Sequence, residues 1–284
     1  MKRRPHLRKT LVLWLRLLLG LVLPLTASAP GSTQAPQRVV TVNLCLDQIA
    51  LRLAAPGQLA GVSMLSHDPR LSVLVDQARV IAPVRPSVEA ILALRPDLVI
   101  FDAVAQSGLK DLVRRAGVAV LEVPWAASLA EAETLFGQIA AALGRLKVGR
   151  AVVADMRRQR SGLASQSRPV ALAAVLQANG ATTGKGSLMG ELLHLAGFRN
   201  LAAEPGIPAY GRWSLETVLA GRPDLLVIDA EANLDPARAT EFVDHAALRS
   251  LAGKAHVVSV PTKYAICAGP ENFHAIRLLA EARR

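Results

Sequence analysis

The amino-acid sequence predicts an α/β protein with two lobes, whose mostly parallel sheets are joined by a single long connector helix. Three observations predict this fold class. Strand and helix patterns alternate in both halves of the chain, residues 128–163 carry only helical patterns, and one 16-residue element occurs twice. Alternation of strands with helices favours parallel sheets. With 284 residues, 51% hydrophobic and 19% charged, the chain is long enough for two cores.

Residues 1–29 have the features of a secretory signal peptide, with a cationic start, a Leu- and Val-rich middle and the small residues Ala27-Ser28-Ala29. We therefore expect an exported protein, with residues 30–37 as a linker. Arg16 interrupts the apolar run and Pro30 follows the expected cleavage site, so an uncleaved anchor is the alternative. No other stretch is long and apolar enough to cross a membrane.

The formal charge of +11 is concentrated at the N-terminus, because residues 1–29 hold six basic and no acidic residues. The remainder has 27 basic and 22 acidic residues, a net charge of about +5. It has no basic run and few aromatic residues, which disfavours nucleic-acid binding. A mildly basic protein of this kind is compatible with an anionic ligand.

The N-terminal lobe is expected to span residues 38–127. It opens on a β-branched run, Arg38–Val42, which is typical of a strand. Pro56-Gly57 and Gly117 each end a helical pattern. We expect strands at 38–42, 59–63, 98–101 and 118–123, with helices at 47–55, 87–94 and 109–116.

The connector is expected at residues 128–167. Ser128 and Glu131 form a capping box that begins a helix running to Leu143. Gly144-Arg145 predicts a turn, and apolar residues at helical spacing then predict a second helix over 146–163.

The C-terminal lobe, residues 168–284, resumes the alternation. Gly186-Ser187 opens a helix that ends at Gly197, and Trp213-Ser214 leads a short helix. Pro270 opens the closing helix, as proline does at a first helical position. We expect strands at 170–176, 225–229 and 256–260, and helical turns at 235–251.

The repeated element comprises residues 87–102 and 214–229, and nine of its sixteen positions are identical at a constant offset of 127. Each copy begins with a Ser suited to a helix N-cap, followed two positions later by Glu89 or Glu216. Arg-Pro-Asp then breaks the helix, because the residue before proline leaves the α region. A short helix and buried strand do not require the recurring Glu and Arg, so we infer a duplication with a shared surface role.

With these residues, the chain resembles the periplasmic binding proteins of ABC importers for iron–siderophore complexes, haem and cobalamin. The resemblance rests on the order and spacing of several motifs. These are Arg38–Asp47, the two Glu…Pro-Asp-Leu elements, Thr183–Ser187, Leu195–Leu201, and Pro261 to Cys267-Ala-Gly-Pro270.

The resemblance implies two Rossmann-like lobes joined by one helix, here the 146–163 stretch, with the ligand in the cleft between them. It implies a monomer without a cofactor. It also implies that Glu89 and Glu216, one acidic residue on each lobe, dock onto an inner-membrane ABC permease dimer. Their alternative role is a favourable charge at a helix N-terminus.

Ligands of α/β lobes bind outside the carboxyl ends of strands, and several aromatic residues lie near those positions. Tyr210 stands where the family carries a cleft aromatic, and Trp213 and Trp125 lie close to other such loops. Tyr264 could ligate haem iron or stack on a planar ligand. His67 is a candidate ligand residue or part of a turn. Some of these aromatics are expected to be core anchors instead.

Three further candidates lie in the predicted cleft loops. Cys45 and Cys267 fall on different lobes and either form a disulfide in an oxidising periplasm or remain two free thiols near the ligand. Lys185 lies in the glycine-rich turn 180–186, whose spacing does not fit a phosphate-binding loop. The turn's amides and Lys185 could instead meet an anionic ligand.

The function predicted is therefore solute binding without catalysis, with a ferric siderophore as the first candidate ligand and haem or a corrinoid next. Glu191-x-x-His194 and Glu271-x-x-His274 do not predict a di-iron site, which requires four long facing helices. We predict no catalytic residues and no metal site. The alternatives are a binding protein for a metal ion and an exported redox or enzyme domain on a double Rossmann scaffold.

Overall fold

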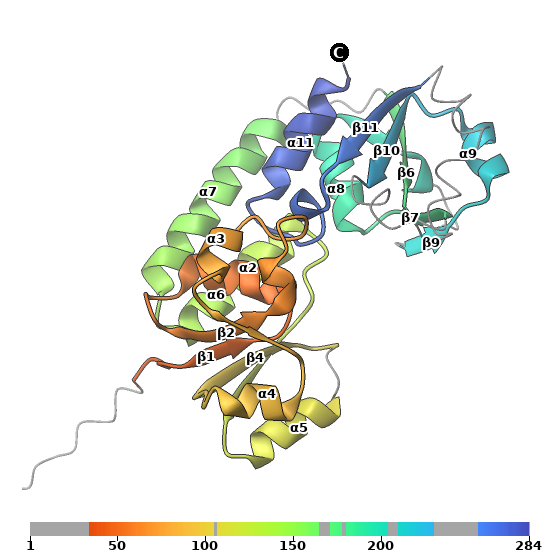
Figure 1. The fold of residues 1–284 in the computed structure, drawn as a ribbon. Helices are drawn as coiled ribbons and strands as arrows, with labels where there is room; N and C mark the ends of the chain where they lie inside the picture. Colours follow the sequence, from red (N-terminus) through yellow and green to blue (C-terminus); the bar gives the residue numbers. More distant parts are fainter. Residues whose placement is uncertain are drawn as a thin grey trace, which may run out of the picture. The chain divides into compact units, whose positions relative to one another are not determined.

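A computed structural model describes residues 34–104, 107–164, 171–177, 180–203, 210–229 and 255–283 (Figure 1). The expected signal peptide and the helical turns expected at 235–251 lie outside these residues. Among the described residues, no helix has the length and apolarity needed to cross a membrane.

The first lobe is built on a five-stranded sheet in which every neighbouring pair is parallel. The strand order is β3-β2-β1-β4-β5. The strands are β1 (Val39–Thr41), β2 (Leu59–Ser63), β3 (Ala82–Val84), β4 (Leu98–Asp102) and β5 (Ala119–Val123). The helices are α2 (Leu44–Leu53), α3 (Val75–Ala78), α4 (Val88–Ala93) and α5 (Ser107–Arg115), with a 3-10 turn at Met64–His67.

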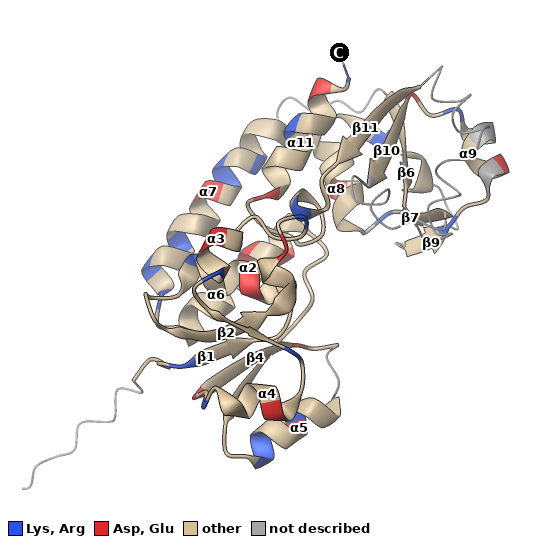
Figure 2. Ribbon diagram, in the orientation of Figure 1, with Lys and Arg blue, Asp and Glu red and all other residues tan. Residues whose placement is uncertain are grey.

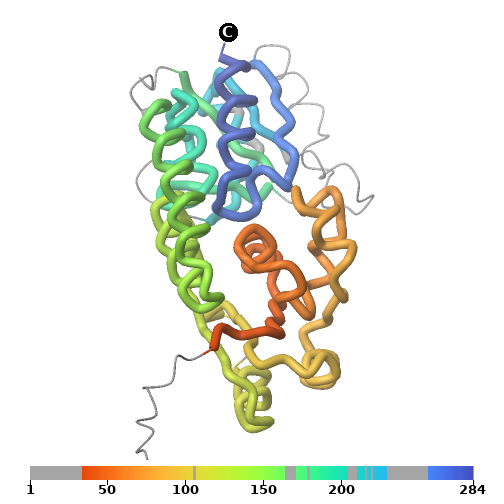
Figure 3. The backbone as a smooth tube through the Cα atoms, turned by 90° about the vertical axis from the view of Figure 1, so that its left-hand side faces the viewer, coloured from red at the N-terminus to blue at the C-terminus, as the bar shows by residue number. Residues whose placement is uncertain are grey.

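Two antiparallel helices follow β5, α6 (Leu129–Ala142) and α7 (Leu146–Ala164), and Figures 1 and 3 show them side by side. Ser128 caps α6 by accepting a hydrogen bond from the backbone N–H of Glu131 at 3.2 Å. A side chain at Gly149 would collide with Ala140 of α6, so glycine allows the two helices to pack closely. The predicted connector helix over 146–163 is confirmed.

The second lobe has a parallel sheet in the order β11-β10-β6-β8. Its strands are β6 (Ala171–Leu176), β8 (Phe198–Asn200), β10 (Leu225–Asp229) and β11 (His256–Val260). A separate antiparallel pair joins β7 (Ala181–Thr183) to β9 (Tyr210–Arg212). The helices are α8 (Leu188–Leu195), α9 (Leu215–Gly221) and α11 (Asn272–Glu281), with 3-10 turns at Leu201–Ala203 and Thr262–Tyr264.

Alternate residues of each central strand serve different cores, as the two-residue period of a strand requires. In the first lobe Val39 packs with α2 and α6, whereas Val40 packs on the opposite face with α4 and α5 (Figure 1). In the second lobe Val175 and Val227 belong to the larger core, which α8 and α11 also join. The predicted α/β class with two lobes and mostly parallel sheets is therefore confirmed, with β7–β9 as the antiparallel exception.

The repeated element forms α4–β4 in the first lobe and α9–β10 in the second. The hydroxyls of Ser87 and Ser214 accept first-turn backbone N–H groups at 3.2 and 3.3 Å, as predicted for N-caps. Arg95 and Arg222 then leave the helix with φ of 46° and 44°. This left-handed conformation is uncommon for residues with a side chain, so the two copies share an unusual backbone as well as a sequence.

The Asp of each Arg-Pro-Asp makes the same two backbone contacts with the first strand of its lobe. The N–H of Asp97 donates to the carbonyl of Arg38 at 3.0 Å, and its carboxylate accepts from the N–H of Arg38 at 3.0 Å. Asp224 makes the equivalent contacts with Leu172 at 2.8 and 2.7 Å. The Asp therefore sets the start of the pairing between the two central strands.

Several helix boundaries differ from those predicted. The helix expected from Asp47 begins at Leu44, because the side chain of Asn43 accepts hydrogen bonds from the backbone N–H groups of the next turn. The closing helix begins at Asn272 rather than Pro270. The short strands β3, β7, β8 and β9 were not predicted.

Candidate ligand-binding site

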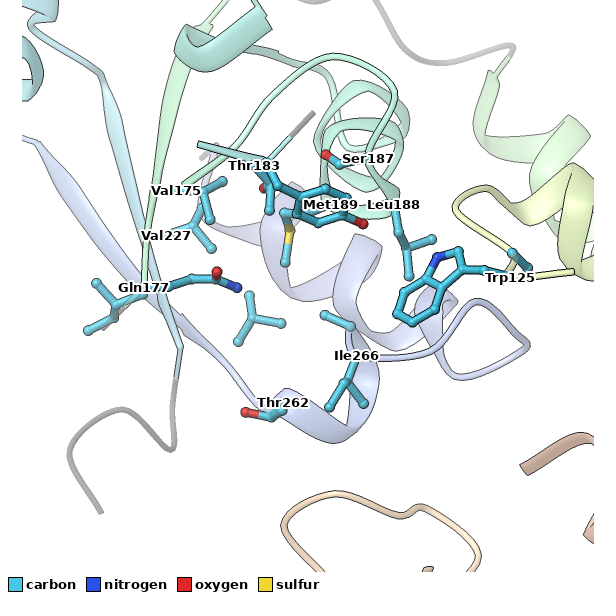
Figure 4. A pocket seen from close by; sticks show the side chains of 15 residues that line it. Trp125, Val175, Gln177, Thr183, Ser187, Leu188, Met189, Val227, Thr262 and Ile266 are labelled. Atoms are coloured by element: carbon cyan, nitrogen blue, oxygen red, sulfur yellow. The ribbon is translucent and has the colours of Figure 1, made fainter. Parts of the chain in front are cut away.

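A pocket of about 270 Å³ lies at the carboxyl ends of three strands of the second lobe (Figure 4). Val175 of β6, Val227 of β10 and Val260 of β11 form its apolar wall. Leu188 and Met189 of α8 add to that wall. The position agrees with the general rule for ligand sites in α/β sheets.

Two aromatic side chains at the pocket are largely exposed. Trp125, in the segment that leads from β5 to α6, is 51% exposed, and Tyr210 at the start of β9 is 58% exposed. Figure 4 shows Trp125 at one side of the pocket and Gln177 at the other. Exposed aromatic rings beside an apolar pocket offer flat surfaces on which a ligand can pack.

Besides the two aromatic side chains, four polar side chains of the described residues line the pocket, namely Gln177, Thr183, Ser187 and Thr262. The hydroxyl of Ser187 is used in the α8 N-cap, where it donates to the carbonyl of Gly184 at 2.7 Å and accepts from Gly190. Among the described residues, none with a formal charge lines the pocket. The site is therefore apolar with a few neutral hydrogen-bonding groups.

Cys45 and Cys267 form a disulfide, with their Cα atoms 5.2 Å apart, which decides between the two alternatives left open by the sequence. The bond joins the first turn of α2 to the segment after β11. In that segment Thr262, Ala265 and Ile266 line the pocket. The cysteines therefore anchor one pocket wall to the other lobe without lining the pocket themselves.

A buried ion pair accompanies the disulfide. Arg52, in the last turn of α2, donates to the carboxylate of Glu271 at 2.8 Å, and the Glu271 side chain is only 2% exposed. Burial raises the pKa of Glu271, and the charge of Arg52 opposes that shift. Sequence reasoning missed this pair, because no spacing signal connects two residues 219 positions apart.

The side chain of Asn272 organises the same segment from within. Its amide donates to the carbonyls of Tyr264 and Cys267 at 2.8 and 2.9 Å. Its oxygen accepts from the N–H of Gly269 at 2.7 Å. A fully hydrogen-bonded buried amide of this kind fixes the course of the loop that forms the pocket wall.

Trp213 was expected at the ligand, but it packs into a separate core with Ala174 and Leu226. Those two residues alternate along β6 and β10 with Val175 and Val227, which line the pocket. Because neighbouring residues of a strand face opposite sides of the sheet, the indole lies on the face away from the pocket wall.

Tyr264 and His67 do not line the pocket either. The ring of Tyr264 is stacked on His274, with centroids 5.1 Å apart, and Lys263 lies over it. Tyr264 also packs against the main core. His67 ends the 3-10 turn after β2, and its Nε2 is buried without a hydrogen-bond partner in the described structure.

Lys185 borders a different cavity, of about 670 Å³, together with Glu131, His194 and Arg199. Gly186 has a φ of 82° and Ser187 caps α8, as expected for a tight turn. The turn lies between this cavity and the pocket, because Ser187 lines both. The structure thus brings Trp125 and Tyr210 to one pocket and leaves Lys185 at a separate place.

Glu89 and Glu216 are both exposed, each in the first turn of its helix. Figure 2 shows the acidic positions on α4 and α9 in red. Their helices are equivalent in the two copies of the repeat.

Residues 39–208, more than half of the chain, match the family model of periplasmic binding proteins. The chain belongs to the periplasmic binding protein family. This confirms the resemblance inferred from its motifs, and members of the family are solute binders. A cobalamin-binding protein of Halobacterium salinarum is 27% identical over 219 residues, which is 73% of this chain. The chain spans only 58% of the length of that relative.

Solved structures show the same fold. The periplasmic heme-binding protein RhuT from Roseiflexus, in its apo form, has a TM-score of 0.70 at 22% identity, covering 87% of this chain and 99% of that one. The vitamin B12 binding protein BtuF of Vibrio cholerae has a TM-score of 0.64 at 20% identity, covering 87% and 96%. A periplasmic heme-binding protein from Pseudomonas aeruginosa gives 0.67 at 24% identity, covering 87% and 92%.

Proposed function

We propose that this chain is the exported solute-binding component of an ABC importer, and that it captures a metal-chelate ligand and delivers it to a membrane permease. The observation that carries the proposal is the apolar pocket at the carboxyl ends of β6, β10 and β11, with Trp125 and Tyr210 exposed at its edge. Membership of the periplasmic binding protein family supports it. The protein binds its ligand without catalysing a reaction on it.

The ligand class follows from the pocket and the relatives together. A ligand with a broad apolar face fits exposed aromatic rings better than a fully polar one. The relative and the solved structures bind cobalamin or heme according to their names. A corrinoid or haem is therefore the first candidate ligand, and a ferric siderophore the next. The pocket of about 270 Å³ lies below the usual range of roughly 300–1,000 Å³, so a large chelate extends past Trp125 and Tyr210.

Export and docking complete the proposal. Residues 1–29 direct export, and the mature chain acts in the periplasm as a monomer. Glu89 and Glu216 dock onto the two halves of a permease dimer, because equivalent acidic residues on two related helices match a two-fold partner.

The experiment that tests the proposal is a titration of the purified mature protein with cyanocobalamin, haemin and ferric siderophores, followed by intrinsic tryptophan fluorescence. The proposal predicts saturable quenching by at least one of these ligands. No response to any of them, together with measurable turnover of another substrate, would refute the binding function.

A further inference from the structure

Thr183 carries a polar atom that has no hydrogen-bond partner among the described residues. The residue is 5% exposed, and its Oγ1 is buried without a hydrogen bond in the described structure. It also lines the pocket. A buried hydroxyl without a partner is destabilising, and most buried polar groups in proteins are paired.

The neighbouring Thr182 provides a comparison within the same strand. It is 1% exposed and its Oγ1 is also buried without a partner in the part of the chain that the structure describes, but it does not line the pocket. Successive side chains of a strand point to opposite faces. Thr183 is therefore the one of the pair that lies on the pocket side of the strand.

The backbone of Thr183 is held in place on both sides. It pairs in register with Tyr210 across β7 and β9. Its carbonyl accepts a hydrogen bond from the buried amide of Asn200 at 2.6 Å. The backbone of Thr183 therefore stands at a fixed position relative to that of Tyr210 before a ligand binds.

Gln177 adds a second neutral group. Its backbone N–H donates to the carbonyl of Ala181 at 2.8 Å, which closes the turn into β7. Its side-chain amide extends into the pocket from the end of β6 (Figure 4). Lysine and arginine, the side chains that bind a carboxylate most strongly, do not occur among the described residues that line this pocket.

We propose that Thr183, assisted by Gln177, is a specificity-determining residue that hydrogen-bonds an uncharged polar group at the edge of the ligand, a carboxamide or a hydroxyl. This inference rests on the proposed function. A neutral group exchanges its water for the Thr183 hydroxyl, whereas a carboxylate brought to the same place loses its hydration without gaining a cation. The pocket thus favours a corrin ring, whose edge carries carboxamides, over haem, whose edge carries carboxylates.

The test compares Thr183→Val with Thr182→Val, two near-isosteric changes of adjacent buried hydroxyls. Affinity for cyanocobalamin and haemin is measured by isothermal titration calorimetry, and the melting temperature is measured without ligand. Thr183→Val should weaken cyanocobalamin binding by about 5- to 10-fold while its melting temperature stays equal or rises. Thr182→Val should leave the affinity unchanged. The wild-type protein should bind cyanocobalamin more tightly than haemin.

Several results would overturn the inference. If Thr183→Val binds cyanocobalamin as the wild type does, the hydroxyl does not contact the ligand, although the proposed function stands. If both valine variants lose affinity and stability together, the role of Thr183 is structural. Tighter binding of haemin than of cyanocobalamin would contradict the inference that the site prefers a ligand whose edge carries uncharged groups. No binding of either ligand or of a ferric siderophore by the wild type would refute the proposed function and this inference with it.

Discussion

Asp47 is a fully buried carboxylate that holds three segments of the first lobe together. It accepts hydrogen bonds from the backbone N–H and hydroxyl of Ser63 at 3.0 and 2.5 Å and from the hydroxyl of Ser66 at 2.7 Å. The hydroxyl of Thr41 is a fourth donor. Burial raises the pKa of Asp47, and these donors oppose the shift. Asp47 thereby fixes α2, and with it Cys45, against β1 and β2.

Replacing Asp47 by Asn should lower the free energy of unfolding by about 2–3 kcal/mol, because the amide NH₂ group then faces donors and leaves them unpaired. Urea denaturation of the purified protein measures this change. Asp76→Asn is the control, since Asp76 pairs with Arg79 on the surface and should change stability by less than about 0.5 kcal/mol. Equal effects of the two substitutions would contradict the role given to Asp47.

The pairing of α5 with β5 depends on pH through Glu122. Its carboxylate accepts from Lys110 at 2.6 Å and also from Arg114. The hydrogen bond from Lys110 is the main cause that holds the pKa of Glu122 below its usual value, and the hydrogen bond from Arg114 is the next. Because the pKa is lower in the folded state, this stabilisation is present above the ordinary carboxyl pKa and is lost as the pH falls through the folded pKa.

The melting temperature should therefore fall on acidification from pH 6 to pH 3 by less in Glu122→Gln than in the wild type. The variant should already melt at a lower temperature at pH 6. Calorimetric scans at several pH values measure both effects. A decrease of equal size in the two proteins would show that Glu122 does not contribute to the pH dependence.

At the scale of the element, the structure explains most of what the two copies of the repeat share. The serines cap helices, Pro96 and Pro223 are buried, and Asp97 and Asp224 bind the first strands. Glu89 and Glu216 are exposed on equivalent helices, which is the pattern expected of a docking surface.

Charge reversal at both sites, Glu89→Lys with Glu216→Lys, should lower ligand uptake into cells by at least about tenfold, because it reverses the charge of the proposed docking surface. Ligand affinity in solution should not change. Asp76→Lys, at another exposed acidic residue, is the control and should retain uptake. Loss of ligand affinity in the double variant would refute the docking role.

The elements that could be predicted from the sequence have strong local signals. Leu59–Ser63, Leu225–Asp229 and His256–Val260 are found as predicted, because each is an apolar or β-branched run next to a turn. The three-residue strand β3 contains Pro83 and gives no such pattern. β7 and β9 exist through their pairing with each other over a long separation in the chain, which local patterns do not record.

At the scale of the whole molecule, α2 is linked to the second lobe at both of its ends. Cys45 and Arg52 are seven residues apart, two helical turns, and so lie on one face of the helix. The first forms the disulfide to Cys267 and the second the ion pair to Glu271. These links hold the Thr262–Ile266 wall of the pocket in position before a ligand arrives.

Removing the disulfide, by Cys45→Ser with Cys267→Ser, should lower the free energy of unfolding by roughly 4–5 kcal/mol, since it closes a very long loop in the unfolded chain. Ligand affinity should also fall, because the pocket wall then has to be ordered on binding. Denaturation and calorimetric titration measure the two effects. Unchanged affinity in a folded double variant would show that the disulfide stabilises the fold without shaping the pocket.

The site could be predicted in outline, because the rule for the carboxyl ends of strands locates it from the strand boundaries alone. That rule pointed to Trp125, and family position pointed to Tyr210, both of which line the pocket. It does not say which face of the sheet a side chain takes, and Trp213, a candidate near these loops by family position, packs into a separate core instead. Thr183 was missed, because a threonine in a glycine-rich segment gives no signal until its burial is known.

The most direct measurement is calorimetric titration of the wild type and of Trp125→Ala, Tyr210→Ala and Leu112→Ala with cyanocobalamin and haemin. Leu112 is a partly exposed apolar residue of α5 outside the pocket lining, so its replacement is the control. The wild type should bind at least one ligand with 1:1 stoichiometry. The first two substitutions should each weaken binding by about tenfold or more, and Leu112→Ala should not. Binding that neither Trp125→Ala nor Tyr210→Ala weakens would contradict a ligand site at this pocket.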